Sequence, residues 1–291
     1  MTIASEPECP SRFCELSNEE GDISAANVTN VTVTCVVPRV MLVAANWALP
    51  HSIFITDDLH SLGDGATAAP RVIEGANTQI SSPDGDSVAV DRGNEVIYVA
   101  DWDGQVLVFN DARTAVGDIT PDRIITVPGA PYLAGMELDM SSTGRLYLTG
   151  WDGADYYLWI YDDPASLNGT ITPDQAIEIP SARALSLDLV NDRLFVSSDY
   201  DEEVYVFDNA SLLATGATPN RTVTWTNPTT GFAGPSSVWL DSCTDRLYVN
   251  SNSYTAAGNY LAVFENASTL DGVVNLDTDS DARLALEAIS V

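Results

Sequence analysis

The sequence contains no lysine. All 12 basic residues are arginine, set against 42 acidic residues, and the formal net charge is -30. A field of this sign repels phosphate groups, which excludes nucleic acid as a partner and disfavours an anionic membrane surface. The carboxylates either form a solvated acidic surface or, in part, bind calcium, whose preferred ligands are oxygen atoms. Calcium is therefore the one cofactor that the composition suggests.

Long hydrophobic runs are also missing, although 45% of the residues are apolar, which is ample for a core. No run approaches the roughly 18 apolar residues of a membrane helix, so we expect no insertion into a membrane. The first residues lack the basic region and apolar core of a signal peptide. No stretch has the pattern of a long amphipathic helix, and the expected fold class is all-β.

Catalytic motifs are absent as well. The chain has no Gly-x-Ser-x-Gly elbow, no phosphate-binding loop and no His-Glu-x-x-His motif. Its two histidines, His51 and His60, both fall at the third strand of the first repeat described below and in the loop that follows. We therefore name no catalytic residue and favour a non-enzymatic role.

A repeat organises the residues that are present. Residues 86–112, DSVAVDRGNEVIYVADWDGQVLVFNDA, predict three short strands joined by two tight turns, with a fourth strand at residues 122–127. Corresponding second strands read MLVAA, IYVAD, LYLTG, LFVSS and LYVNS, and the third strands read IFITDD, VLVFND, LWIYDD, VYVFDN and LAVFEN. The period of about 50 residues is that of a four-stranded propeller blade. In the first copy the strands are expected at residues 31–34, 40–45, 52–56 and 71–74.

Segments such as VAVDRGNEVIYVADWDGQVLVFNDA and LSLDLVNDRLFVSSDYDEEVYVFDNAS resemble the NHL and YVTN classes of bacterial β-propeller repeats. The resemblance covers residues 31–291 and implies a single β-propeller. We predict five four-stranded blades over residues 29–291, after an acidic N-terminal extension over residues 1–28; a six-bladed ring is the less favoured alternative. Such repeats occur in receptors, scaffolds, lyases and lactonases, so the fold assigns no function.

The four cysteines are Cys9, Cys14, Cys35 and Cys243, and none belongs to a Cys-x-x-Cys motif. Cys35 follows the inner strand of the first repeat and Cys243 follows that of the fifth, so they become neighbours if the last blade closes against the first. We predict a Cys35–Cys243 disulfide that closes the ring and a Cys9–Cys14 disulfide; buried free thiols are the alternative. Disulfides imply an oxidising compartment, hence an extracellular or cell-surface protein.

An aspartate ends four of the five predicted inner strands, and three of these aspartates precede an arginine at the start of the next strand. Four carboxylates at one position of a ring suggest a metal or catalytic site. However, aspartate at the mouth of a tight turn also binds backbone amides, and we favour this structural role with an arginine partner across the hairpin. The aspartates are Asp91, Asp139, Asp188 and Asp241, and the arginines are Arg145, Arg193 and Arg246.

The turn between the second and third strands places aromatic residues beside carboxylates and amides. In propellers of the resembled type these turns lie on the face that binds ligands. Such residues suit stacking on a sugar ring while its hydroxyls are bound, or holding a cation; alternatively they only form turns and cap their own blades. The candidate ligand-binding residues are Trp47, Asp101, Trp102, Asp103, Trp151, Asp152, Asp199, Tyr200 and Asn252.

We therefore expect a secreted or cell-surface binding module that recognises a glycan, a small ligand or a protein through this loop face. The alternative is a calcium-dependent, lactonase-like hydrolase or lyase with a metal in the central channel. The related lactonases use Glu, Asn and Asp side chains that converge from inner strands. Only Glu137 fits that description here, either as a channel-facing ligand or as a buried residue with a partner.

Overall fold

The computed structural model divides the chain into two compact units, residues 1–41 with 57–68 and residues 42–56 with 69–291. The first unit contains, among the described residues, an antiparallel pair of strands, β1 (Phe13–Ser17) and β2 (Thr32–Val36). For residues 13–17, 32–36, 42–46, 84–86, 260 and 282–285 only the backbone is described. The structure describes residues 13–17, 32–36, 42–46, 50–56, 71–140, 144–226, 234–251, 260–276 and 282–285.

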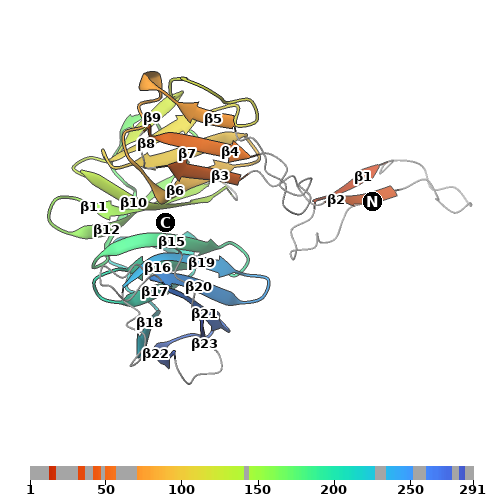
Figure 1. Ribbon diagram of the computed structural model, residues 1–291. Helices are drawn as coiled ribbons and strands as arrows, with labels where there is room; N and C mark the ends of the chain where they lie inside the picture. Colours follow the sequence, from red (N-terminus) through yellow and green to blue (C-terminus); the bar gives the residue numbers. More distant parts are fainter. Residues whose placement is uncertain are drawn as a thin grey trace, which may run out of the picture. The chain divides into compact units, whose positions relative to one another are not determined.

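In the described residues of the second unit we find four complete blades of four antiparallel strands, which we name A to D (Figure 1). Blade A consists of β6 (Pro83–Asp91), β7 (Val96–Asp101), β8 (Gln105–Phe109) and β9 (Arg123–Thr126). Blade B consists of β10 (Tyr132–Asp139), β11 (Arg145–Trp151), β12 (Tyr156–Asp162) and β14 (Gln175–Glu178). Blade C consists of β15 (Ala182–Asp188), β16 (Arg193–Ser198), β17 (Glu203–Asp208) and β18 (Arg221–Thr226). Blade D consists of β19 (Pro235–Asp241), β20 (Arg246–Ser251), β21 (Tyr260–Glu265) and β23 (Ala282–Ala285).

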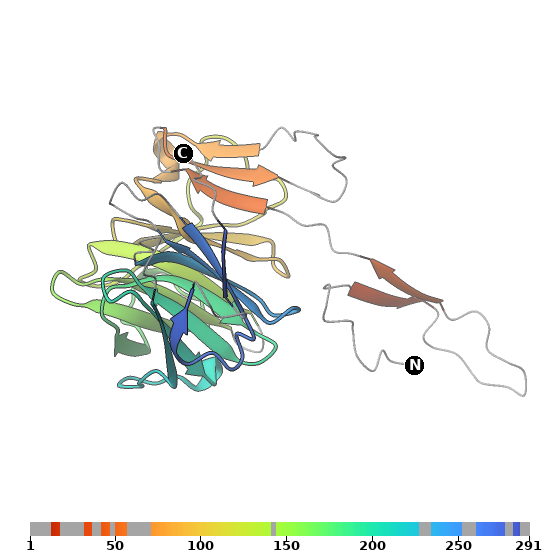
Figure 2. The same cartoon turned by 60° about the horizontal axis from the view of Figure 1, so that its bottom comes forward.

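A further sheet of three strands precedes blade A: β3 (Leu42–Asn46), β4 (Ser52–Thr56) and β5 (Arg71–Glu74). The innermost strands follow one another in chain order, with β3 against β6, β6 against β10, β10 against β15 and β15 against β19. Figures 1 and 2 show the sheets of this unit succeeding one another from orange to blue. The arrangement is an all-β propeller, as predicted. Helical structure in the described residues is limited to two 3-10 turns, η2 (Ala76–Thr78) and η3 (Ala210–Leu212), and none of it is long enough to cross a membrane.

The hydrophobic core lies between neighbouring blades, because alternate residues of each strand face opposite sides of the sheet. Tyr98 of blade A packs with Trp159 and Tyr161 of blade B. Ile160 of blade B packs with Phe207 of blade C, and further side chains of blade C pack with those of blade D. Each such side chain contributes on the order of 1.5–3 kcal/mol when fully buried, so the blades stabilise one another rather than standing alone.

One arginine at each seam between sheets donates hydrogen bonds to two backbone carbonyls of the next blade. The carbonyls lie three residues apart in the loop after the third strand. Arg71 reaches them with its two terminal nitrogens, whereas each of the other three arginines donates both bonds from Nη1. The pairs are Arg71 with Ala112 and Ala115 (2.9 and 2.7 Å), Arg123 with Pro164 and Leu167 (2.9 and 2.8 Å), Arg145 with Ala210 and Leu213 (3.4 and 3.5 Å), and Arg221 with Ala267 and Leu270 (3.3 and 3.0 Å).

The same loops add parallel strand pairs that the sequence did not predict. β13 (Gly169–Thr170) pairs with β9, and β22 (Gly272–Asn275) pairs with β18, so the chain after a third strand reaches back to the preceding blade. Blades A and C thereby gain a fifth strand.

The prediction for the first repeat was wrong in its inner strand. Residues 31–34 were expected in the first blade, but β2 pairs with β1 in a separate sheet. An alternating pattern identifies a strand but not its neighbour, and residues 13–17, which were assigned to the N-terminal extension, supply that neighbour. Among the described residues the first sheet consequently has three strands rather than four. The predicted boundary between residues 28 and 29 lies outside the described residues and remains a prediction.

Cys243 is disulfide-bonded. The side chains of Cys9, Cys14 and Cys35 are outside the described part of the chain, so the Cys35–Cys243 and Cys9–Cys14 pairings remain predictions. The register of β1 and β2 places Cys14 directly opposite Cys35, which is a third pairing to consider.

Candidate functional site

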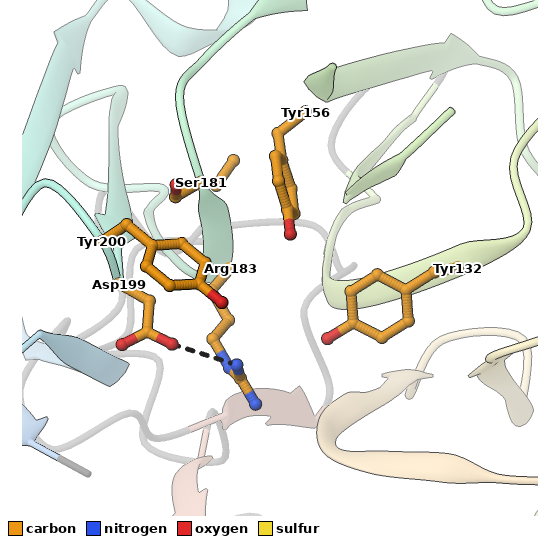
Figure 3. Close-up of a pocket in the computed structure, with 7 residues that line it drawn as sticks. Tyr132, Tyr156, Ser181, Arg183, Asp199 and Tyr200 are labelled. Atoms are coloured by element: carbon orange, nitrogen blue, oxygen red, sulfur yellow. Dashed lines mark hydrogen bonds and ion pairs between the residues drawn. The ribbon is translucent and has the colours of Figure 1, made fainter. Parts of the chain in front are cut away.

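A pocket of about 140 Å³ lies between blades B and C, at the edge where β10, β12 and β15 begin and β16 ends (Figure 3). This is the edge that carries the turns between second and third strands, the predicted loop face. The lining residues are Tyr132, Tyr156, Ser181, Ala182, Arg183, Asp199 and Tyr200.

A β-bulge at the start of β15 positions Arg183. Ala182 pairs with Ser198 but Leu185 pairs with Val196, so the register shifts across the residues between them. Bulges bend a strand and redirect its side chains. The other three blades have irregularities at the same end of their inner strands, between Pro83 and Val88, Leu133 and Gly135, and Pro235 and Ser237.

Close packing of the inner strands fixes this bulge. The Thr149 hydroxyl of blade B donates a hydrogen bond to the Arg183 carbonyl. A Cβ atom on Gly135 would lie 2.4 Å from that carbonyl oxygen, so only glycine fits there. The backbone of Arg183 is therefore held by blade B while its side chain lines the pocket.

Arg183 forms an ion pair with Asp199, with 3.2 Å between a guanidinium nitrogen and a carboxylate oxygen. The two side chains are 28% and 10% exposed. Asp199 directly follows β16, and its amide donates to the Ser181 carbonyl at 3.3 Å. The pocket floor therefore contains one positive and one negative charge that largely cancel.

Three tyrosines surround this ion pair. Figure 3 shows the Tyr132 and Tyr156 hydroxyl groups pointing into the space beside Arg183, with the Tyr200 ring near Asp199. Tyr132 and Tyr156 are half-buried, whereas Tyr200 is 77% exposed. Trp102 of blade A meets Tyr132 edge to face, with ring centroids 5.1 Å apart, and extends the aromatic surface across the A–B seam.

Of the predicted ligand-binding residues, Asp199 and Tyr200 line the pocket and Trp102 contacts its wall. Asp103 is exposed and Trp151 is half-buried at the end of β11, opposite Tyr156. Trp47 and Asn252 lie outside the described residues.

Two predicted ligand-binding residues have their carboxylates engaged by the fold. Asp101 is buried and accepts hydrogen bonds from the Ser81 amide and hydroxyl and from the amides of Ser82 and Trp102, at 2.6–2.9 Å. Asp152 is exposed and accepts hydrogen bonds from the amides of Asp155 and Ala154, which lower its pKa. In both residues the carboxylate therefore has the turn-forming role that was the alternative to ligand binding.

The sequence-based prediction missed Tyr132, Tyr156, Ser181 and Arg183. Tyr132 had a signal, since it directly follows a Gly- and Pro-rich connection between blades. Arg183 stands five residues before the aspartate that ends its inner strand, where blades B and D have Ala134 and Ser236. Because bulges do not follow the two-residue period of a strand, that position could not be assigned to the pocket face in advance.

Three of the four aspartates that end the inner strands belong to turns, as favoured from the sequence. Asp91 accepts hydrogen bonds from the amides of Gly93 and Asn94 at 2.9 and 3.0 Å, and Asp188 and Asp241 repeat this pattern. The arginine partner across the hairpin is found for Asp188 and Arg193. Arg145 and Arg246 contact Asp162 and Glu265 on the third strand.

A metal centre has no candidate in the described part of the chain, where no group of three or more His, Cys, Asp or Glu side chains is arranged to hold an ion. Glu137 is half-buried and has an interaction partner. The described residues thus offer calcium no convergent set of carboxylates.

No protein-family model matches the chain, and no curated protein matches it. Among solved structures, the WD40 domain of coronin from Toxoplasma gondii is similar, with a TM-score of 0.53 and 11% sequence identity. The match covers 84% of this chain and 56% of that chain, so this chain spans little more than half the length of its structural neighbour. At this level of identity the likeness shows the fold alone, which is a β-propeller.

Proposed function

We propose that this chain is a binding module that recognises a glycan, a small ligand or a protein through its loop face. On this face, the residues that we propose to contact the ligand are the pocket residues together with Trp102. The supporting observation is the pocket between blades B and C, in which one exposed and two half-buried tyrosine rings surround a mostly buried ion pair. Pockets that combine apolar walls with a few convergent polar groups are the usual sites of ligand binding.

The proposed location is extracellular or at the cell surface. The disulfide at Cys243 supports an oxidising compartment, and the acidic, lysine-free surface supports solubility without nucleic-acid binding. Within this proposal the propeller is of the NHL/YVTN kind with five blades, and the β3–β5 sheet forms part of the first.

The test uses a glycan array and a peptide array with the full chain and three variants. Trp102→Ala and Tyr200→Ala should abolish specific binding, because both rings belong to the loop face. Leu212→Ala is the matched control: Leu212 is an equally exposed apolar residue, 77% exposed like Tyr200, outside the pocket lining. Binding that survives both aromatic substitutions would show that the loop face is not the recognition surface.

The alternative function, a calcium-dependent hydrolase or lyase, has no supporting observation among the described residues. A thermal-shift series with calcium and with EDTA tests it directly. We expect no change in Tm with either addition; a rise of several degrees with calcium that EDTA reverses would instead indicate a bound ion.

A further inference from the structure

We propose that the pocket between blades B and C binds a single neutral sugar ring. This inference rests on the proposed function and names the ligand class for the same site. Charge, size and hydrogen-bonding groups of the pocket each point to this class.

Charge at the pocket itself favours neither ionic class of ligand. Among the described lining residues Arg183 is the only cation and Asp199 the only anion, and they are 3.2 Å apart. A cationic ligand would meet Arg183 at close range. An anionic ligand would lose part of its attraction to Arg183 because Asp199 neutralises it, and would also have to approach a chain of net charge -30. A neutral polar ligand faces neither penalty.

Size limits the ligand to about one ring. Pockets for drug-sized molecules enclose roughly 300–1,000 Å³, and this one holds about 140 Å³. The pocket is open on the side of Tyr200, the most exposed of its tyrosines, so a ring could be the terminal unit of a longer chain.

The polar groups match the hydroxyls of a sugar. A sugar hydroxyl both donates and accepts hydrogen bonds. The Asp199 carboxylate accepts, the Arg183 guanidinium donates, and the hydroxyls of Ser181, Tyr132 and Tyr156 do both. The exposed Tyr200 ring offers a flat apolar surface for the C–H face of the same sugar. A purely apolar ligand would leave the ion pair desolvated without new partners, which costs free energy.

The experiment is saturation-transfer-difference NMR on the full chain, with methyl glucoside, galactoside, mannoside and xyloside as neutral probes. Glucuronic acid and glucosamine are the anionic and cationic probes. We expect a saturable signal from at least one neutral glycoside and none from the charged sugars. Tyr200→Ala should weaken binding about tenfold, Tyr200→Phe should keep most of it, and Leu212→Ala should change nothing.

Two further variants test the charge argument with opposite expectations. Asp199→Asn leaves Arg183 without its counter-charge and should turn the preference toward glucuronic acid. Arg183→Gln leaves Asp199 and should turn the preference toward glucosamine. Far-UV circular dichroism and urea midpoints establish that each variant is folded; Tyr200→Ala, whose side chain is mostly in solvent, serves where the ion-pair variants fail to fold.

Three results would overturn the inference. They are a wild-type preference for a charged sugar, a neutral-sugar signal unchanged by Tyr200→Ala, and no signal from any probe. In each case the proposed function survives if the arrays still show binding that depends on Trp102 and Tyr200, and it fails with the inference if they do not.

Discussion

The two ends of the blades use aspartate in different ways. At the turns between first and second strands, Asp91, Asp188 and Asp241 occupy one repeated position and accept hydrogen bonds from their own turns. At the loop face, Asp101 and Asp152 also accept hydrogen bonds from backbone amides, but Asp199 pairs with an arginine that a bulge places in a pocket. A carboxylate that binds its own turn at a repeated position belongs to the fold, whereas a carboxylate whose arginine partner lines a pocket is a candidate for function.

The largest effect on stability is expected at the turns between first and second strands, where the aspartates repeat. Asp188 and Arg193 form an ion pair whose side chains are 0% and 6% exposed, with the Arg193 Nε donating at 2.9 Å. Removing one partner leaves the other charge buried, so Arg193→Ala should lower the free energy of unfolding by about 3 kcal/mol. Urea denaturation measures this directly.

The control for Arg193→Ala is Arg113→Ala, which breaks the exposed pair with Glu95. An exposed ion pair contributes little, so the loss should be below about 1 kcal/mol. If both substitutions lower the free energy of unfolding by the same amount, burial does not decide the strength of these ion pairs. The contrast drawn between the two ends of the blades would then lose its physical basis.

The next largest loss of stability is expected on substitution of the arginines that connect neighbouring blades. Arg123→Ala removes the donors of two carbonyls, those of Pro164 and Leu167, and should destabilise the chain by about 2 kcal/mol. Arg123→Lys should recover only part of this loss, since the other terminal nitrogen of Arg123 donates to the Tyr98 hydroxyl at 3.3 Å, and an ammonium does not present this second donor. Full recovery by lysine in urea denaturation would show that charge alone is sufficient at the seam.

Lowering the pH should reduce the contribution of Asp188 to the stability of the fold. Burial by itself would raise the pKa of Asp188, but the hydrogen bonds from Asn191 and Arg193 outweigh it, and the net shift is downward. A carboxyl whose pKa is lower in the folded state stabilises the fold above its unfolded pKa, and this contribution disappears as the pH falls through the folded value. The stability difference between wild type and Asp188→Asn should therefore be full at pH 7 and shrink below about pH 4. A difference that is constant from pH 7 to pH 3 would contradict the assignment.

The sequence predicted the repeated parts of this molecule and not the irregular ones. The strand alternation and the recurring aspartate gave the propeller and the turns correctly, because each is a local pattern seen several times. The inner strand of the first repeat was misplaced, since the alternation at residues 31–34 does not specify a partner. In the pocket, Asp199 and Tyr200 were found from their turn, but Arg183 depends on a bulge and on the close approach of blade B at Gly135. Contacts of this kind between blades are set by tertiary packing and leave no periodic signal.

The smallest effect on stability is expected at the loop face itself. Trp102 is 46% exposed, and its edge-to-face contact with Tyr132 accounts for about 0.5–1.5 kcal/mol at most, so Trp102→Ala should move the urea midpoint only slightly. Its effect on ligand binding should nevertheless be the larger one, because the indole supports the Tyr132 wall of the pocket. The two variants should then affect different properties. Arg193→Ala should lower stability in a chain that still binds its ligand when folded, and Trp102→Ala should lower binding in a chain that remains stable. A Trp102→Ala variant that loses several kcal/mol of stability would place this residue with the fold, and Tyr200 would remain as the aromatic residue on which recognition depends.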